Sequence, residues 1–265
     1  SSVLLQAVGT WHGRAFSHPG PRPRWRVLME RDAVALWRGT GQRLQALLLL
    51  ALIALFTFSL MRLPLGDDTG LRELLFLPVC ALAQVILLAV GARFVFPAGS
   101  LERPGGWFLF NAPVRAQEHL RAKVTLFILA LLPLSALLGV AVCWIFKPSP
   151  AALAVAIANF IVTPCMVAVL NTGLGVAWAR QDASQPEDVI SSPAGVLAMV
   201  CCTLVVLGQN ALLAVPIREV WRSQLLHTPA SWAGLGLPVA LWVGLQGIAM
   251  GLPWRAAVRR IQDFE

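Results

Sequence analysis

The chain has 265 residues, of which 57% are hydrophobic and 13% charged, and its formal net charge is +8. A soluble globular domain carries about 25% charged residues, so the composition excludes an ordinary soluble protein. The apolar residues lie in six long stretches, which indicates a polytopic membrane protein.

The first 43 residues form a basic arm before the first apolar stretch, and no secretory signal peptide is apparent in them. We expect one helix in this arm, over residues 25–39, lying along the membrane surface. Four apolar residues share one face of such a helix, while three arginines recur at every seventh position on another: Trp25, Met29, Ala33 and Leu36 against Arg24, Arg31 and Arg38. This separation is typical of an interfacial helix.

The six apolar stretches predict an all-α fold with a transmembrane domain over residues 44–252, followed by a tail at 253–265. Even the shortest span covers roughly 27 Å at 1.5 Å per residue, close to the hydrocarbon thickness of a bilayer. Prolines inside three spans predict kinks. Each proline frees the carbonyl group four residues earlier, and a neighbouring helix can donate a hydrogen bond to it. The predicted spans are 44–61, 74–92, 124–146, 151–178, 194–215 and 232–252, and the prolines are Pro78, Pro133 and Pro164.

A polar segment, residues 96–123, separates the second and third spans. It combines charged residues with an aromatic cluster of Trp107, Phe108 and Phe110. Pro113 suits the first turn of a helix, and we expect that helix to run directly into the third span.

The Lys and Arg residues are distributed unevenly between the two sides of the predicted spans. Sixteen of the 21 fall on the side that holds both termini, and five on the other side. Because cytoplasmic segments carry this excess, both termini are predicted to be cytoplasmic. This sidedness, together with attraction to anionic lipid headgroups, accounts for the net charge, so no nucleic-acid partner is expected.

Residue types that perform catalysis or hold cofactors are missing from the predicted spans. No charged residue lies in the middle of a span, and all four histidines lie outside the spans. No GxxxxGK[ST] motif occurs, because neither lysine follows a glycine. We therefore expect no catalytic residue, no metal and no cofactor here, and no enzyme activity. Any ATP hydrolysis is expected to belong to a partner chain.

Uncharged polar residues do occur inside the spans, and they have two interpretations. They either line a translocation path or pack helices together through hydrogen bonds. The candidates are Gln84, Asn159, Asn171, Gln209, Asn210 and Gln246, with Thr163 and Thr172 beside them.

Three separated segments resemble motifs of one family of bacterial ATP-binding-cassette (ABC) exporter permeases of the type-2 class, in its C-terminal part. They are RDAVALWRGTGQRLQALLLL (31–50), RFVFPAGSLERPGGWFLFNAP (93–113) and GLGVAWARQDASQPEDVISSPAG (173–195). Their order matches that family, as does the layout of a surface helix, two spans, a cytoplasmic connection and four further spans. The Pro-Gly-Gly at 104–106 departs from the helix formers expected in the connection.

The resemblance implies a permease subunit of an ABC exporter in the bacterial inner membrane, which forms the translocation path. Its implied partners are the lipid bilayer, a separate ABC ATPase, and a second copy or second permease half. The ATPase would dock on the cytoplasmic connection, through Ser100, Glu102, Trp107, Arg115 and Arg121. The alternative is a non-catalytic accessory subunit of a larger membrane complex, with that complex's other subunits as partners.

Overall fold

The computed structural model describes residues 24–38, 40–63, 69–100, 116–178, 186–226 and 232–262. These ranges are helical almost throughout and contain no strand. The helices are α2 (Arg24–Arg38), α3 (Thr40–Met61), α4 (Thr69–Ser100), α6 (Ala116–Phe146), α7 (Pro150–Ala177), α8 (Pro186–Ile190), α9 (Pro193–Leu226) and α10 (Trp232–Gln262).

The predicted six-span, all-α fold is confirmed. Six of these helices, α3, α4, α6, α7, α9 and α10, are long and apolar enough to cross a membrane. Several extend beyond the apolar stretch that predicted them: α4 continues to Ser100 and α6 already begins at Ala116. Hydropathy marks only the lipid-facing length of a helix, whereas backbone hydrogen bonding continues into polar residues at its ends. The division into arm, transmembrane domain and tail stays a prediction.

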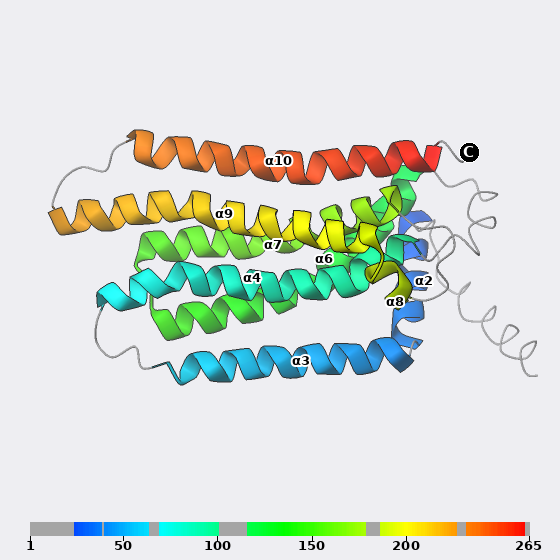
Figure 1. Ribbon diagram of the computed structural model, residues 1–265, viewed down its shortest axis with the longest axis horizontal. Helices are drawn as coiled ribbons and strands as arrows, with labels where there is room; N and C mark the ends of the chain where they lie inside the picture. The colour runs from blue at the N-terminus through cyan, green and yellow to red at the C-terminus, as the bar shows by residue number, and fades with distance from the viewer. Residues whose placement is uncertain are drawn as a thin grey trace, which may run out of the picture.

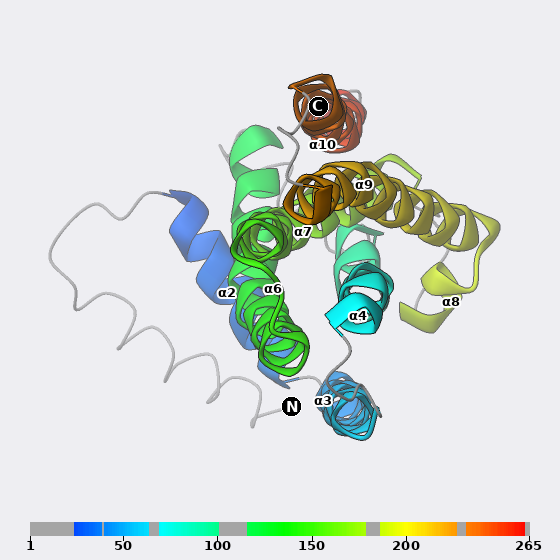
Figure 2. The same ribbon diagram turned by 90° about the vertical axis from the view of Figure 1, so that its left-hand side faces the viewer.

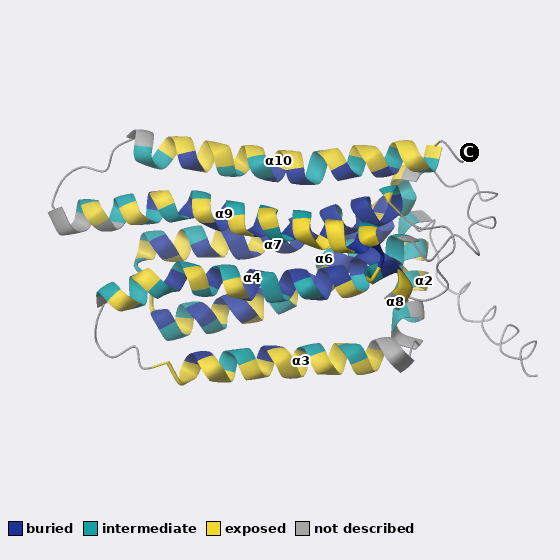
Figure 3. Ribbon diagram, viewed as in Figure 1, coloured by how far each residue is buried: buried dark blue, intermediate teal, exposed yellow. Residues whose placement is uncertain are grey.

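The six long helices run side by side, and α7 occupies the centre of the bundle (Figures 1 and 2). Half of the most apolar stretch of α7 is buried, compared with 11% of that of α3. The core of the bundle is built from α4, α6, α7 and α9, with Leu87, Phe127, Met166 and Val206 among its members. The outward faces of α3 and α10 are mostly exposed (Figure 3), and their apolar residues there suit contact with lipid.

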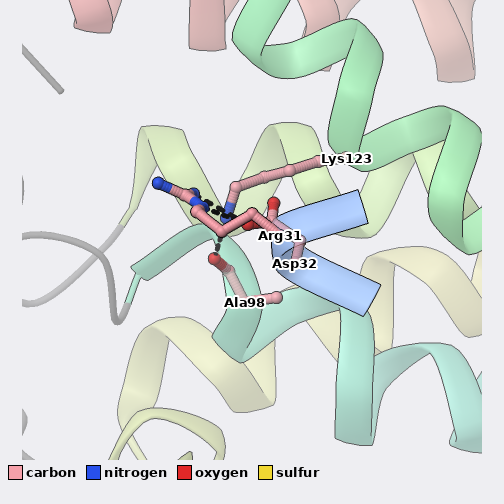
Figure 4. A network of polar contacts seen from close by, with 4 residues as sticks. All are labelled: Arg31, Asp32, Ala98 and Lys123. Atoms are coloured by element: carbon pink, nitrogen blue, oxygen red, sulfur yellow. Dashed lines mark hydrogen bonds and ion pairs between the residues drawn. The ribbon is translucent and has the colours of Figure 1, made fainter. Parts of the chain in front are cut away.

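The predicted surface helix is present as α2, which crosses one end of the bundle rather than running along it (Figure 1). The ends of α4, α7 and α10 and the start of α6 lie at this same end. α2 packs beside α6, where Arg31 pairs with its neighbour Asp32 at 2.7 Å (Figure 4). Nearby, the buried Lys123 of α6 donates from Nζ to the main-chain oxygen of Ala98 in the last turn of α4. A lysine thereby bonds one of the carbonyl groups that the end of α4 leaves unpaired.

Pro164 in the middle of α7 lacks the N–H that would bond to the Phe160 oxygen four residues earlier. Ser135 of α6 supplies the missing donor, since its Oγ lies 2.6 Å from that oxygen. The expectation that a neighbouring helix bonds a carbonyl freed by proline therefore holds at this position.

The helices approach most closely near the end where α2 lies. A Cβ at Gly175 of α7 would overlap the main-chain oxygen of Phe96 in α4. A Cβ at Gly173 would lie 2.6 Å from Cβ of Pro253 in α10. Because glycine has no side chain, α7 contacts the backbones of two neighbours on either side here.

The segment after the fifth apolar stretch begins as a continuation of that span, because α9 runs through Pro216 to Leu226 as one helix. The segment is therefore largely an extension of the fifth span, with the described residues resuming at Trp232 in α10.

Candidate functional site, a buried amide cluster

Six polar side chains meet halfway along four helices, and together they are called the amide cluster below. Each is at most 5% exposed. Every one lies near the middle of its helix, so it sits at the depth of the hydrocarbon core. The members are Gln84 of α4, Asn159 and Thr163 of α7, Gln209 and Asn210 of α9, and Gln246 of α10.

Gln209 is the hub of the amide cluster, because it bonds to three other helices. Its Nε2 donates to Gln84 Oε1 at 2.8 Å and to Thr163 Oγ1 at 2.9 Å. Its Oε1 accepts from Gln246 Nε2 at 2.5 Å. One side chain of α9 therefore joins α4, α7 and α10.

Asn210, the next residue along α9, extends the network. Its Nδ2 donates to Gln84 Oε1 at 2.6 Å and to the oxygen of Val206 at 2.8 Å. Asn159 Nδ2 donates to Asn210 Oδ1 at 3.3 Å. Asn159 and Thr163 are four residues apart on α7, so helical geometry places both on the face that meets α9.

The network leaves some of its own polar atoms unmatched. Gln84 Nε2, Asn159 Oδ1 and Gln246 Oε1 are buried and have no hydrogen-bond partner in the described part of the chain. The same holds for the indole nitrogen of Trp242, one turn before Gln246 on α10. Such atoms cost about 1–3 kcal/mol each when buried without a partner.

Asn171 was predicted with the cluster members but lies apart from them. It is fully buried two turns further along α7, and its Nδ2 bonds to the Val167 oxygen at 2.9 Å. Its Oδ1 lies 3.9 Å from Sγ of Cys202 on α9. Asn171 is therefore a separate packing contact between α7 and α9.

The residues predicted to contact an ATPase fall mostly outside the described residues. Glu102, Trp107 and Arg115 lie in the gap between α4 and α6. Ser100 is the last residue of α4, and its side chain is not described. Arg121 is exposed on α6, at the end of the bundle where α2 lies.

The chemistry of the amide cluster is that of neutral hydrogen bonding. Its members are amides and one hydroxyl, and the buried lysine, Lys123, is at the bundle's end rather than in the cluster. Among the described residues, no group of three or more His, Cys, Asp and Glu could hold a metal ion. The cluster can bond to uncharged donors and acceptors.

Three structural roles were not predicted from sequence. Trp242 contributes an indole N–H to the inner face of α10, Ser135 bonds the carbonyl freed by Pro164, and Lys123 bonds the end of α4. Only Lys123 carried a sequence signal, since a lysine beside an apolar stretch is conspicuous. A serine or tryptophan inside a span does not reveal which helix it meets.

Comparison with known proteins identifies a family but no individual relative. A sequence-family model described as "Putative ATP-binding cassette" matches residues 15–265. No curated protein and no solved structure matches the chain.

This match corrects three predictions made from the sequence. The matching family is described as an ATP-binding cassette, so the identification with a permease family is wrong, and so is the assignment as a permease subunit. The alternative of a non-catalytic accessory subunit gains no support from it either. The prediction of no enzyme activity, with ATP hydrolysis left to a partner, is overturned as well, because ATP-binding cassettes are ATPases.

The permease assignment was wrong because the features behind it are not specific to one activity. Three short motifs and a six-span hydropathy pattern describe how helices insert into a bilayer, which proteins of different activity share. The lack of a GxxxxGK[ST] motif concerns one loop and does not decide membership of a family matched across nearly the whole length. The chain belongs to the family described as "Putative ATP-binding cassette".

Proposed function

We propose that this chain is a membrane-integral component of an ABC transport system in the bacterial inner membrane. The observation that carries the proposal is that the family match covers residues 15–265, a range that contains all six apolar helices. ATP-dependent work and membrane insertion therefore belong to the same stretch of chain.

In this system the amide cluster holds four of the spans together. Gln209 bonds to residues of α4, α7 and α10 at once, so a displacement of α9 along its axis would break several contacts together. Interhelical hydrogen bonds in membranes contribute about 0.6 kcal/mol on average. The cluster thus fixes the axial register of these helices, but each of its bonds is weak enough to be broken and remade.

The end of the bundle where α2 lies is proposed to face the cytoplasm. The support is the excess of Lys and Arg on that side of the predicted spans. We also propose that an ABC partner chain docks at this end, contacting Arg121 together with Ser100, Glu102, Trp107 and Arg115. Arg121 is exposed there, as a docking residue must be.

The test is to purify the tagged full-length chain from native membranes in a mild detergent and measure ATP hydrolysis sensitive to vanadate. Labelling with a photoreactive azido-ATP then shows which polypeptide carries the nucleotide. Hydrolysis with label on this chain supports the proposal, and label found only on a co-purifying chain counts against it. A folded preparation with neither hydrolysis nor label refutes it.

The docking proposal has its own matched pair of variants. Arg121→Glu reverses an exposed charge at the α2 end, whereas Arg62→Glu reverses an exposed charge just after α3, at the opposite end. We expect Arg121→Glu to lower recovery of the ABC partner and Arg62→Glu to leave it unchanged. Equal recovery with both variants would rule out docking at this end.

A further inference from the structure

We propose that the amide cluster is a closed binding site for an uncharged hydroxyl or amide group, and that α10 is the helix that opens it. This inference goes beyond the ABC assignment and does not depend on it, since the binding is tested without nucleotide.

The unmatched atoms are the first step of the argument. Gln84 Nε2, Asn159 Oδ1 and Gln246 Oε1 come from three helices that meet in the amide cluster. If the cluster served only to pack helices, its amides would be expected to bond to one another fully. Lipid chains offer no partner to a spare amide. The spare atoms therefore mark positions at which a further polar group can bond.

The nature of the spare atoms indicates the chemical class of that partner. One of the three is an amide nitrogen, which donates, and two are carbonyl oxygens, which accept. A hydroxyl or an amide both donates and accepts, so it matches this set. An ion does not, because the amide N–H opposes a cation and the two carbonyl oxygens oppose an anion.

The present conformation of the site is closed. The three unmatched atoms have almost no surface accessible to solvent, so a ligand enters only when a helix moves. α10 lies at the edge of the bundle (Figures 1 and 2). It is among the least buried of the spans, with 17% of its most apolar stretch covered.

Near the α2 end α10 is pinned against α7, because Pro253 lies directly against Gly173. Further along, the outer side of α10 carries Gly236, Gly244, Gly247 and Gly251, where an added Cβ would meet no described atom within 4 Å. No described helix therefore blocks an outward tilt of α10 on this side. Tilting about the pinned end would separate Gln246 from the cluster.

The inner face of α10 carries the groups that such a movement would present. Gln246 and Trp242 are four residues apart and so share one face. Each has an unmatched polar atom, an acceptor on Gln246 and a donor on Trp242. When α10 moves, this pair would contribute to the site together with Gln84 and Asn159.

The experiment uses two photoreactive probes that differ in one hydroxyl group, a diazirine-bearing octanol and the corresponding octane. The full chain is reconstituted in nanodiscs of phosphatidylethanolamine and phosphatidylglycerol, and labelled peptides are identified by mass spectrometry. We expect the octanol to label the peptides that contain Gln209 and Gln246, and the octane to label the lipid-exposed α3. Equal labelling of the Gln246 peptide by both probes would overturn the proposal.

Matched substitutions test whether the amides are responsible. Gln246→Met keeps the length of the side chain and removes its carbonyl, whereas Gln117→Met makes the same change at an exposed position on α6. We expect Gln246→Met to lower octanol labelling of the cluster about tenfold, which corresponds to about 1.4 kcal/mol, and Gln117→Met to have no effect. Unchanged labelling in folded Gln246→Met protein would overturn the proposal.

A reversible crosslink tests the role of α10 even where a substitution in the cluster impairs folding. A Cβ at Gly208 of α9 would lie 3.7 Å from Cδ2 of Leu245 on α10, so the thiols of Gly208→Cys and Leu245→Cys lie close enough for a short, reducible bifunctional thiol reagent to join the helices. Crosslinking should abolish octanol labelling of the cluster, and reduction should restore it. Labelling that is equal in the crosslinked and reduced forms would contradict the movement of α10.

Discussion

Replacing Gln209 by leucine tests whether one side chain holds four helices together. The substitution removes three hydrogen bonds, those to Gln84, Thr163 and Gln246. At roughly 0.6–1.7 kcal/mol for each interhelical bond in a membrane, we expect a loss of roughly 2–5 kcal/mol of stability. The loss includes the cost of leaving the amide nitrogen of Gln246 without a partner.

Two comparison variants make this magnitude informative. Gln246→Leu removes the bond to Gln209 and leaves Gln209 Oε1 without a donor, but it also removes the unmatched carbonyl of Gln246. These two burial costs offset each other, so the loss should be that of one interhelical bond, roughly 0.6–1.7 kcal/mol. Gln117→Leu lies at an exposed position and should change stability by less than about 0.5 kcal/mol. The expected order of destabilisation is therefore Gln209, then Gln246, then Gln117.

The assay is unfolding in detergent, followed with a thiol-reactive dye. Cys143, Cys165 and Cys201 are only half-buried, so they are replaced by alanine in every variant. Cys80 and Cys202 are 3% and 0% exposed, and the dye then reports the opening of the core around α4 and α9. The midpoints of the variants are compared under one set of conditions. If Gln209→Leu unfolds with the wild-type midpoint, or Gln246→Leu is the more damaging change, the hub role assigned to Gln209 is wrong.

Three further predictions concern packing and helix ends. Gly175→Ala should destabilise the protein by several kcal/mol, because the new methyl group overlaps the backbone of α4. Gly244→Ala should be neutral or slightly stabilising, because no described atom lies near the new methyl group. Thermal midpoints measured in detergent compare the two variants. Ser192→Ala should cost about 0.5–2 kcal/mol, since the Oγ that caps the start of α9 is lost, and the same midpoint checks it. Lys123→Met should loosen the end of α4 without opening the middle of the bundle, so hydrogen exchange should rise there and stay unchanged around the cluster.

The six-span fold was predictable because it depends on a local property. About twenty successive apolar residues suffice to form a helix that spans a bilayer, and no knowledge of neighbouring helices is needed. The surface helix α2 was predictable for the same reason, since the spacing of Trp25 and Met29 against Arg31 defines two faces. The helix ends were placed less well, because helices such as α4 continue past their apolar residues.

The candidate site was predictable only as a set of residues. The sequence singled out Gln84, Gln209, Asn210 and Gln246 as polar residues inside spans, but it could not separate them from Asn171. Helical periodicity relates residues within one helix and says nothing about which helices are neighbours. Family membership likewise came from a match over most of the chain, where short motifs had led to the wrong family.

The sequence by itself therefore determined the number of spans, the surface helix and the sidedness of charge, since each depends on residues close together along the chain. Only the tertiary structure decided that Gln209 meets residues of three other helices, up to 125 positions away. It also decided that Ser135 replaces the donor lost at Pro164, and that α10 is pinned at one end by Gly173. These contacts depend on how the helices rotate and cross, which is set by side-chain packing across the whole bundle.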